Sequence, residues 1–211
     1  ACITSAFWPE TRSRSKSRPT TSPRVASTSV TSKAARRRSV SRVGTEPVPG
    51  YAVAFQQVAI AGGTPLAIRA LLDNQQYADP LGRAAAAGIS PASWALFGLI
   101  WPSAQKLADL MQAWDLGHRR ILEIGCGLAL ASMVVHRRGG EITASDRHPL
   151  AADFLRANLV LNSLPTMPYL TGNWETENQA LGRFDLIIGS DLLYEAELAR
   201  TLRSGGQPLG D

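Results

Sequence analysis

The stretch Ile121-Leu122-Glu123-Ile124-Gly125-Cys126-Gly127-Leu128-Ala129 decides the fold of this 211-residue chain. An apolar run containing the acid Glu123 leads into two glycines, and residues with helical propensity follow. Glycine has no Cβ, so a ligand can approach the backbone of Gly125 and Gly127 closely. The N–H groups at the start of the next helix are free to bind an anionic group. We therefore expect a strand, a glycine loop and a helix that together form a ligand site.

A second apolar run, residues 141–145, leads into the acid Asp146. A carboxylate at the end of this second strand can accept hydrogen bonds from both hydroxyls of a ribose. The two runs predict a nucleoside cofactor on a doubly wound α/β sheet. The dinucleotide fingerprint G-x-G-x-x-G does not fit, because Leu130 stands where its third glycine belongs. An NAD-dependent oxidoreductase is therefore a distant alternative.

Strand-like and helix-like segments alternate after residue 118. The pattern predicts strands at 120–125, 141–146, 168–171 and 184–190 and helices at about 128–138 and 149–162. This alternation with short loops favours a parallel sheet with right-handed crossovers. Ligands on such sheets bind beyond the carboxyl ends of the strands. Candidate ligand-binding residues collect at those ends, namely Glu123, Asp146, Asn173, Trp174 and Asp191.

An extension is expected to precede this sheet. Alternating apolar residues predict a hairpin with strands at 53–60 and 68–72 and a bulge at Gln56-Gln57. A core-facing helix is predicted to begin at Pro102-Ser103 and to end at Gly117. The fold class is therefore α/β, a doubly wound, mostly parallel sheet with an N-terminal hairpin and helix extension.

The acid-x-Gly-x-Gly pattern from Glu123 to Gly127 resembles the first motif of class I S-adenosylmethionine (SAM) methyltransferases, with Ala129 where a third glycine is common. Further motifs narrow the resemblance: Leu99 to Ala104, Ser145-Asp146 with Asn158 and Asn162, Gly172-Asn173-Trp174, and Asp185 to Tyr194. Over about residues 51–195 the chain is similar to the methyltransferase-like group of seven-strand protein-lysine methyltransferases, which includes relatives of calmodulin-lysine methyltransferase. The resemblance implies a Rossmann-like fold with SAM as the cofactor.

The resemblance also implies a role for each matching residue. It assigns cofactor contacts to Trp101, Glu123, Gly125, Gly127, Asp146, Asn173, Trp174 and Ser190. Asp146 is expected to bind the ribose, and the indole of Trp174 to stack on the adenine. Asp191 and Tyr194 match an Asp-x-x-Tyr motif at the substrate amine and are the expected catalytic residues. Simpler alternatives remain, since Trp101 could be a core residue and Asp191 a helix cap.

The expected chemistry is methyl transfer to an amine. A lysine with a pKa near 10.4 is mostly protonated at neutral pH, yet the transfer needs the lone pair of the neutral amine. Asp191 can orient the amine or receive its proton, directly or through water. Leu192-Leu193 stand where nucleic-acid amine methyltransferases carry Pro-Pro, which argues against a flipped base. We expect a SAM-dependent N-methyltransferase that acts on a protein side chain, lysine first, with a small-molecule methyltransferase as the alternative.

The N-terminal segment differs from the rest in composition. Residues 1–50 hold ten Lys and Arg and two Glu, a net charge of +8, so the remainder carries −3 of the total of +5. A Ser/Thr/Arg/Pro-rich segment buries too little apolar surface to order itself. We interpret residues 1–48 as a disordered basic tail, an organelle transit peptide or non-native upstream sequence. Residues 49–117 are then the hairpin and helical lead-in, and residues 118–211 the SAM-binding domain.

Composition narrows the location and the partners. No run of 18 apolar residues occurs, so we expect no transmembrane helix and no membrane partner. Cys2 and Cys126 do not make a disulfide framework, which favours the cytoplasm, or the mitochondrion if the first segment is a transit peptide. The three histidines are scattered, so no metal site is expected. Nucleic acid is a partner only if the basic tail is real, and we expect a monomer whose partner is a lysine-bearing protein.

The chain supplies four of the seven strands that the resemblance implies. The family order is 3-2-1-4-5-7-6, and only 17 residues follow Tyr194. We therefore expect a truncated copy whose fourth strand is an apolar edge. A third alternative for its function follows from this, namely an inactive SAM-binding fragment.

Overall fold

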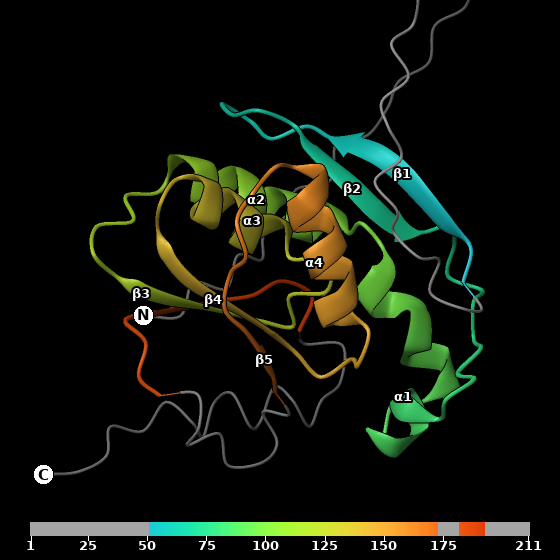
Figure 1. The fold of residues 1–211 in the computed structure, drawn as a ribbon. Coiled ribbons are helices and arrows are strands. Elements are labelled where there is room, and N and C mark those ends of the chain that lie inside the picture. Colours follow the sequence, from blue (N-terminus) through green and yellow to red (C-terminus); the bar gives the residue numbers. More distant parts are fainter. Residues whose placement is uncertain (1–50, 173–181, 193–211) are drawn as a thin grey trace, which may run out of the picture. The chain divides into compact units, whose positions relative to one another are not determined.

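The structure, a computed structural model, describes residues 51–172 and 182–192. Its elements follow the chain from a hairpin into an α/β unit (Figure 1). They are β1 (Val53–Val58), β2 (Leu66–Leu71), α1 (Arg83–Ala86), the 3₁₀ helix η1 (Pro91–Gly98), α2 (Pro102–Ala113), β3 (Arg120–Ile124), α3 (Leu130–Arg137), β4 (Glu141–Asp146), α4 (Ala151–Leu161), β5 (Tyr169–Thr171) and β6 (Leu186–Ile188). Within these described residues no helix is long and apolar enough to cross a membrane.

The main sheet is parallel throughout and has the order β5-β4-β3-β6. Counted from the strand before the glycine loop, this is the order 3-2-1-4, so the predicted doubly wound α/β fold is confirmed. Ile124 pairs with Ser145 and Asp146 with Thr171, so the carboxyl ends of β3, β4 and β5 lie side by side. The helices α2, α3 and α4 lie on one side of these strands (Figure 1). The carboxyl ends at which the sequence predicts a ligand site therefore lie side by side.

The hairpin is antiparallel and pairs Val53 with Leu71 and Val58 with Leu66. The register is continuous through Gln56 and Gln57, so the predicted bulge is wrong. Both glutamines are exposed, because β1 is the outer strand of a two-stranded sheet. An exposed strand does not need to alternate apolar and polar residues, and the break in alternation therefore did not report a break in pairing.

Two side-chain amides of α4 bind the edge of β2 that β1 leaves free. Asn158 accepts from Arg69 N (2.7 Å) and donates to Arg69 O (3.3 Å). Asn162 does the same with Ala67, at 2.8 Å for both bonds. Four residues of helix rise about 6 Å and two residues of strand about 6.7 Å, so the two spacings match. The guanidinium of Arg69 also lies 4.6 Å from the ring of Phe154 on α4. We call these two asparagines the amide clamp.

The ends of two helices differ from the prediction for identifiable reasons. Helix α2 ends at Ala113, four residues before Gly117. Arg138, from the end of α3, donates to the carbonyls of Met111 (2.5 Å) and Trp114 (2.8 Å) and so satisfies the end of α2 without a glycine. Helix α4 begins at Ala151, because hydrogen bonds of His148 hold residues 147–150 in a turn of their own.

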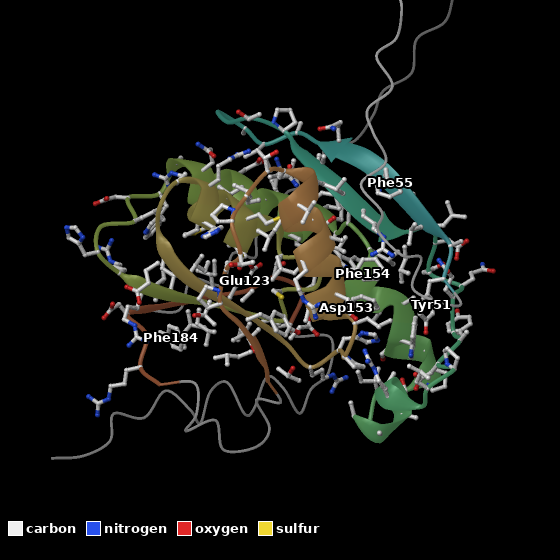
Figure 2. The ribbon with its side chains drawn as sticks, in the orientation of Figure 1. Tyr51, Phe55, Glu123, Asp153, Phe154 and Phe184 are labelled. Carbon is white, nitrogen blue, oxygen red and sulfur yellow. The ribbon has the colours of Figure 1, made fainter. Side chains whose placement is uncertain are left out.

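The hairpin and the main sheet share one hydrophobic core. Figure 2 shows Phe154 of α4 and Glu123 of β3 inside this region, and Tyr51 at its border. The segment η1 lies between the two parts: a Cβ on Gly98 would come within 2.5 Å of Leu71, and one on Gly127 within 2.8 Å of the carbonyl oxygen of Phe97. The lead-in segment is therefore packed against both the hairpin and the glycine loop.

Candidate functional site

The glycine loop follows β3 and turns in the left-handed region of backbone conformation. Gly125 has φ 57°, Gly127 φ 50° and Ala129 φ 57°. Gly127 has a second constraint, because the Phe97 carbonyl leaves no room for a Cβ. The loop is anchored to the neighbouring strand by Cys126 N, which donates to Ser145 O at 3.0 Å. The loop therefore lies over the ends of β3 and β4.

Asp146 ends β4 and holds this loop. Its Oδ2 accepts from Gly127 N and its Oδ1 from His148 N, both at 2.8 Å. The residue is 7% exposed, and burial raises the pKa of its carboxyl. A carboxylate oxygen has two lone pairs, so each oxygen can still accept another donor such as a ribose hydroxyl. The ribose role of Asp146 stays a prediction, and its role in fixing the loop is an addition that the sequence did not indicate.

Glu123 lies two residues before the loop and is 2% exposed (Figure 2). Its Oε2 accepts from the backbone N–H of Ser132 at 2.8 Å and from the Ser132 hydroxyl. Burial raises the pKa of Glu123 to about 7, against the opposing effect of these two hydrogen bonds. The carboxyl group is thus attached to the first turn of α3. Its expected contact toward the methionine end of the cofactor stays a prediction.

The acceptor side is built from two segments that lie 88 positions apart. Asp191 follows β6 in a left-handed conformation, φ 51°, and its Oδ2 accepts from the hydroxyl of Ser103 at the start of α2. Trp101, directly before α2, is 36% exposed and donates from Nε1 to Leu96 O at 2.9 Å. The half-buried Ser190 precedes Asp191. The structure therefore brings the upstream Trp-Pro-Ser segment to the expected catalytic aspartate.

The segment after β6 also passes close to the glycine loop. A Cβ on Gly189 would lie 3.0 Å from the carbonyl oxygen of Ile124 and 2.5 Å from Leu192 Cδ1. Ile124 is the last residue of β3 and directly precedes Gly125. Of the predicted site residues, Asn173, Trp174 and Tyr194 lie outside the described residues. The other seven lie in β3 and the loop after it, at the end of β4, directly before α2 and directly after β6.

The buried rings of Trp94, Phe97 and His148 form an aromatic cluster close to the glycine loop. The ring of His148 stacks on the ring of Phe97, with 3.7 Å between the ring centroids. It meets the ring of Trp94 edge-to-face, with 5.1 Å between the centroids. His148 Nδ1 accepts from Leu150 N at 3.2 Å, and burial lowers the pKa of His148 to about 3. The ring is therefore neutral and carries its proton on Nε2. Trp94, Phe97 and His148 are all buried, and the part played by His148 was not predicted from the sequence.

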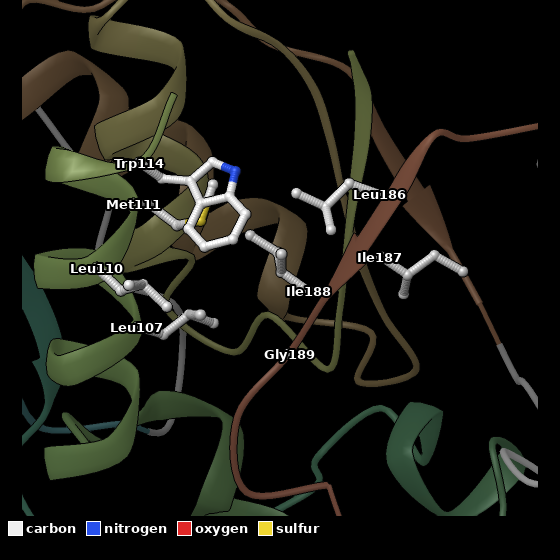
Figure 3. A pocket seen from close by; sticks show the side chains of 8 residues that line it. All are labelled: Leu107, Leu110, Met111, Trp114, Leu186, Ile187, Ile188 and Gly189. Carbon is white, nitrogen blue, oxygen red and sulfur yellow. The ribbon is translucent and has the colours of Figure 1, made fainter. Parts of the chain in front are cut away.

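A separate apolar cavity lies between α2 and β6 (Figure 3). Its volume is about 30 Å³, roughly the space of one water molecule, which is far too small for a nucleoside. It is lined by Leu107, Leu110, Met111, Trp114, Leu186, Ile187, Ile188 and Gly189. The cavity is therefore not the cofactor site. Within residues 51–172 and 182–192 no group of side chains is suited to hold a metal ion.

Comparison with known proteins identifies the family. A family model described as lysine methyltransferase matches residues 85–205, which is more than half of the chain. The chain therefore belongs to the lysine methyltransferase family, and the resemblance inferred from the sequence is confirmed.

Curated relatives extend this assignment. The chain is 32% identical over 112 residues to the electron transfer flavoprotein beta subunit lysine methyltransferase of Rattus norvegicus, covering 52% of this chain and 42% of the relative. It is 31% identical over 108 residues to protein N-lysine methyltransferase METTL21A of Danio rerio, covering 47% and 49%. The chain thus spans about half the length of the curated relatives it matches.

Solved structures with a similar arrangement include SMU.776, a methyltransferase described as putative and complexed with SAH. The TM-score is 0.42 at 12% identity, and the match covers 67% of this chain and 32% of that one. We base no argument on so distant a likeness.

Proposed function

We propose that the protein is a SAM-dependent N-methyltransferase that acts on lysine side chains of a protein substrate. The observation that carries this proposal is the convergence of three groups at the carboxyl ends of the parallel strands. They are the glycine loop after β3, Asp146 at the end of β4 and the Ser103–Asp191 pair after β6. Membership of the lysine methyltransferase family supports the same conclusion.

The residues at this edge fit SAM as a ligand. Asp146 offers a buried carboxylate with spare acceptor capacity to the ribose hydroxyls. Gly125 and Gly127 let the loop backbone approach the ligand, and Trp101, directly before α2, offers a partly exposed indole. When bound, SAM supplies an electrophilic methyl group carried on a sulfonium. The neutral His148 ring adds no competing positive charge beneath the loop.

Asp191 is the residue we assign to the acceptor. Its carboxylate is exposed, and it lies two residues past Gly189, which contacts the end of β3. A carboxylate there can accept hydrogen bonds from a lysine ammonium and hold the nitrogen toward the cofactor. It can also receive the proton that the amine must lose, directly or through water. We extend the same acceptor role to Tyr194, which lies outside the described residues.

The substrate class follows from the relatives. One relative is named for lysine methylation of the electron transfer flavoprotein beta subunit, and another as a protein N-lysine methyltransferase. We propose a lysine-bearing protein of this kind for the present chain. A small-molecule acceptor and an inactive cofactor-binding fragment are the other outcomes that the following assay separates.

The assay measures transfer of a tritiated methyl group from SAM to purified electron transfer flavoprotein beta subunit, with the site located by mass spectrometry. We expect label on lysine, and turnover lower by roughly 10²-fold or more in Asp191→Ala, because the proton acceptor is lost. The affinity for SAH, the demethylated cofactor, should not change. The control is Glu141→Gln, which changes an acid at the amino end of β4, away from the proposed site.

Three results would contradict the proposal. Label confined to small amines would favour the small-molecule alternative. Binding of SAH without transfer to any protein would favour the inactive fragment. Normal turnover in Asp191→Ala would leave Asp191 as a structural residue.

A further inference from the structure

We propose that Ser103 is a positioning residue that fixes the carboxylate of Asp191 at the acceptor side of the site. The hydrogen bond between Ser103 and Asp191 is present in the structure whatever the protein does. Only its effect on methyl transfer rests on the proposed function. Ser103 was part of a motif in the sequence, but neither its spacing nor its residue type assigned it a partner 88 positions away.

The first support is the geometry of the contact. The Ser103 hydroxyl donates to Asp191 Oδ2, so one oxygen of this exposed carboxylate is held. A free aspartate side chain samples several rotamers, and a hydrogen bond to a charged group restricts it to those that keep the bond. Asp191 is therefore presented to an incoming amine in one orientation.

The second support is the backbone of Asp191. Its φ of 51° lies in the left-handed region, which costs a residue with a Cβ about 1 kcal/mol. Such conformations persist where the surrounding structure imposes them. Here the chain is constrained before Asp191 by the close approach of Gly189 to Ile124 and at Asp191 itself by Ser103.

The third support is the rigidity and charge of the element that carries Ser103. It is the second residue of α2, a helix of twelve residues that begins at Pro102. The start of the helix is fixed by Trp101, whose indole N–H binds Leu96 O, and by Gln105 N, which binds Trp101 O at 3.1 Å. A carboxylate beside a helix N-terminus is also favoured by the helix dipole. One rigid element thus carries both Trp101 and the residue that orients Asp191.

The test of the contact is spectroscopic and needs no substrate. The chain is labelled with ¹³C-aspartate, and the Asp191 carboxyl resonance is identified by its loss in Asp191→Asn. We expect this resonance to move in Ser103→Ala and to stay near its wild-type position in Ser103→Thr, which keeps the hydroxyl. Ser90→Ala, which removes an exposed hydroxyl bound to Ser93, is the control. An unmoved resonance in Ser103→Ala would overturn the inference.

Unfolding by urea provides a second readout of the same contact. Ser103→Ala should lower the urea midpoint in the wild-type background and have no further effect in an Asp191→Ala background, because the partner is then absent. Equal effects in both backgrounds would show that Ser103 acts on something other than Asp191 and would overturn the inference.

Methyl transfer then tests what the contact does. Ser103→Ala should lower kcat by about tenfold with little change in KM or in SAH affinity, and Ser103→Thr should restore most of it. Wild-type kcat in Ser103→Ala, with the resonance moved, would overturn the positioning role. Wild-type kcat in Asp191→Ala, or no transfer by the wild-type chain, would contradict the proposed function instead. The resonance and the urea midpoint would still decide whether Ser103 fixes Asp191.

Discussion

Glu123 and Asp146 are two buried carboxyl groups on neighbouring strands, and each is bound to the segment that follows a strand. Glu123 binds the first turn of α3, and Asp146 binds the glycine loop and the turn before α4. The sequence located both acids, because an acid before a glycine pair and an acid at the end of an apolar run are local patterns. It did not reveal their partners Ser132 and His148, which depend on how the following turns fold back.

Glu123→Gln should change the dependence of stability on pH. The pKa of Glu123 is about 7 in the folded chain against a value of 4.5 without the fold, so the folded state binds the proton more tightly between these values. Wild-type stability should therefore fall as pH rises from about 4.5 to 7. Glutamine keeps an acceptor for Ser132 and carries no charge, so the variant should lack this fall. Between pH 4 and pH values above 7 the wild type should therefore lose about 3 kcal/mol of stability relative to Glu123→Gln, at 1.36 kcal/mol per pKa unit.

Urea unfolding at several pH values between 4 and 8 measures this effect, with the exposed Glu141→Gln as control. The same slope for Glu123→Gln and the wild type would mean that the pKa of Glu123 is the same in the folded and the unfolded chain.

Gly127→Ala should cost more stability than its backbone conformation alone explains. The matched control is Gly139→Ala, which has a similar positive φ of 79° but nothing within 4 Å of the added Cβ. We expect about 1 kcal/mol for the control, from the left-handed conformation. Gly127→Ala should lose more, because the new Cβ lies 2.8 Å from the Phe97 carbonyl oxygen. If Gly127→Ala and Gly139→Ala lost the same stability in thermal or urea unfolding, η1 would have to move away from the new Cβ at little cost in free energy.

The elements follow the sequence pattern closely where one strand or helix decides its own limits. The strand at 141–146 was predicted with the bounds that the structure has, and the predicted helix at 149–162 contains α4. The pattern failed where a distant side chain intervenes. Arg138 ends α2, and the amide clamp joins α4 to a strand about 90 positions earlier. Local periodicity contains no information on such contacts.

The amide clamp should control exchange at one edge of β2. Asn158→Leu keeps roughly the size of the side chain but removes both the acceptor for Arg69 N and the donor to Arg69 O, so it should destabilise the chain by about 1–3 kcal/mol. Amide hydrogen exchange should accelerate at Ala67 and Arg69, whose N–H groups bind the clamp. Ile68 is the internal control, since alternate amides of β2 point toward β1. Unchanged exchange at Arg69 would show that the clamp does not protect this edge.

At the scale of the whole molecule, the sheet order and the sharing of one core explain why residues from distant segments meet. Parallel strands end at the same edge, so Glu123, Asp146 and Asp191 come together without being near in sequence. The parallel arrangement was predicted from the alternation of strands and helices, and the strand order from the resemblance to the methyltransferase family. The packing of η1 between the hairpin and the glycine loop was not, because η1 reads in the sequence as an apolar patch. Among the described strands β6 forms an edge, and Ile187 on it is 49% exposed.

The most direct test of the account is a calorimetric titration of SAH into the wild-type chain and into three variants at the two ends of β4. The wild type and Glu141→Gln should bind equally. Asp146→Ala should bind about 1–3 kcal/mol more weakly, the loss expected when hydrogen bonds to a charged group are removed. Asp146→Asn keeps the size of the side chain but not the carboxylate, so it should also bind SAH more weakly than the wild type. No binding by the wild type, or wild-type affinity in both Asp146 variants, would contradict a cofactor site at the ends of β3 and β4.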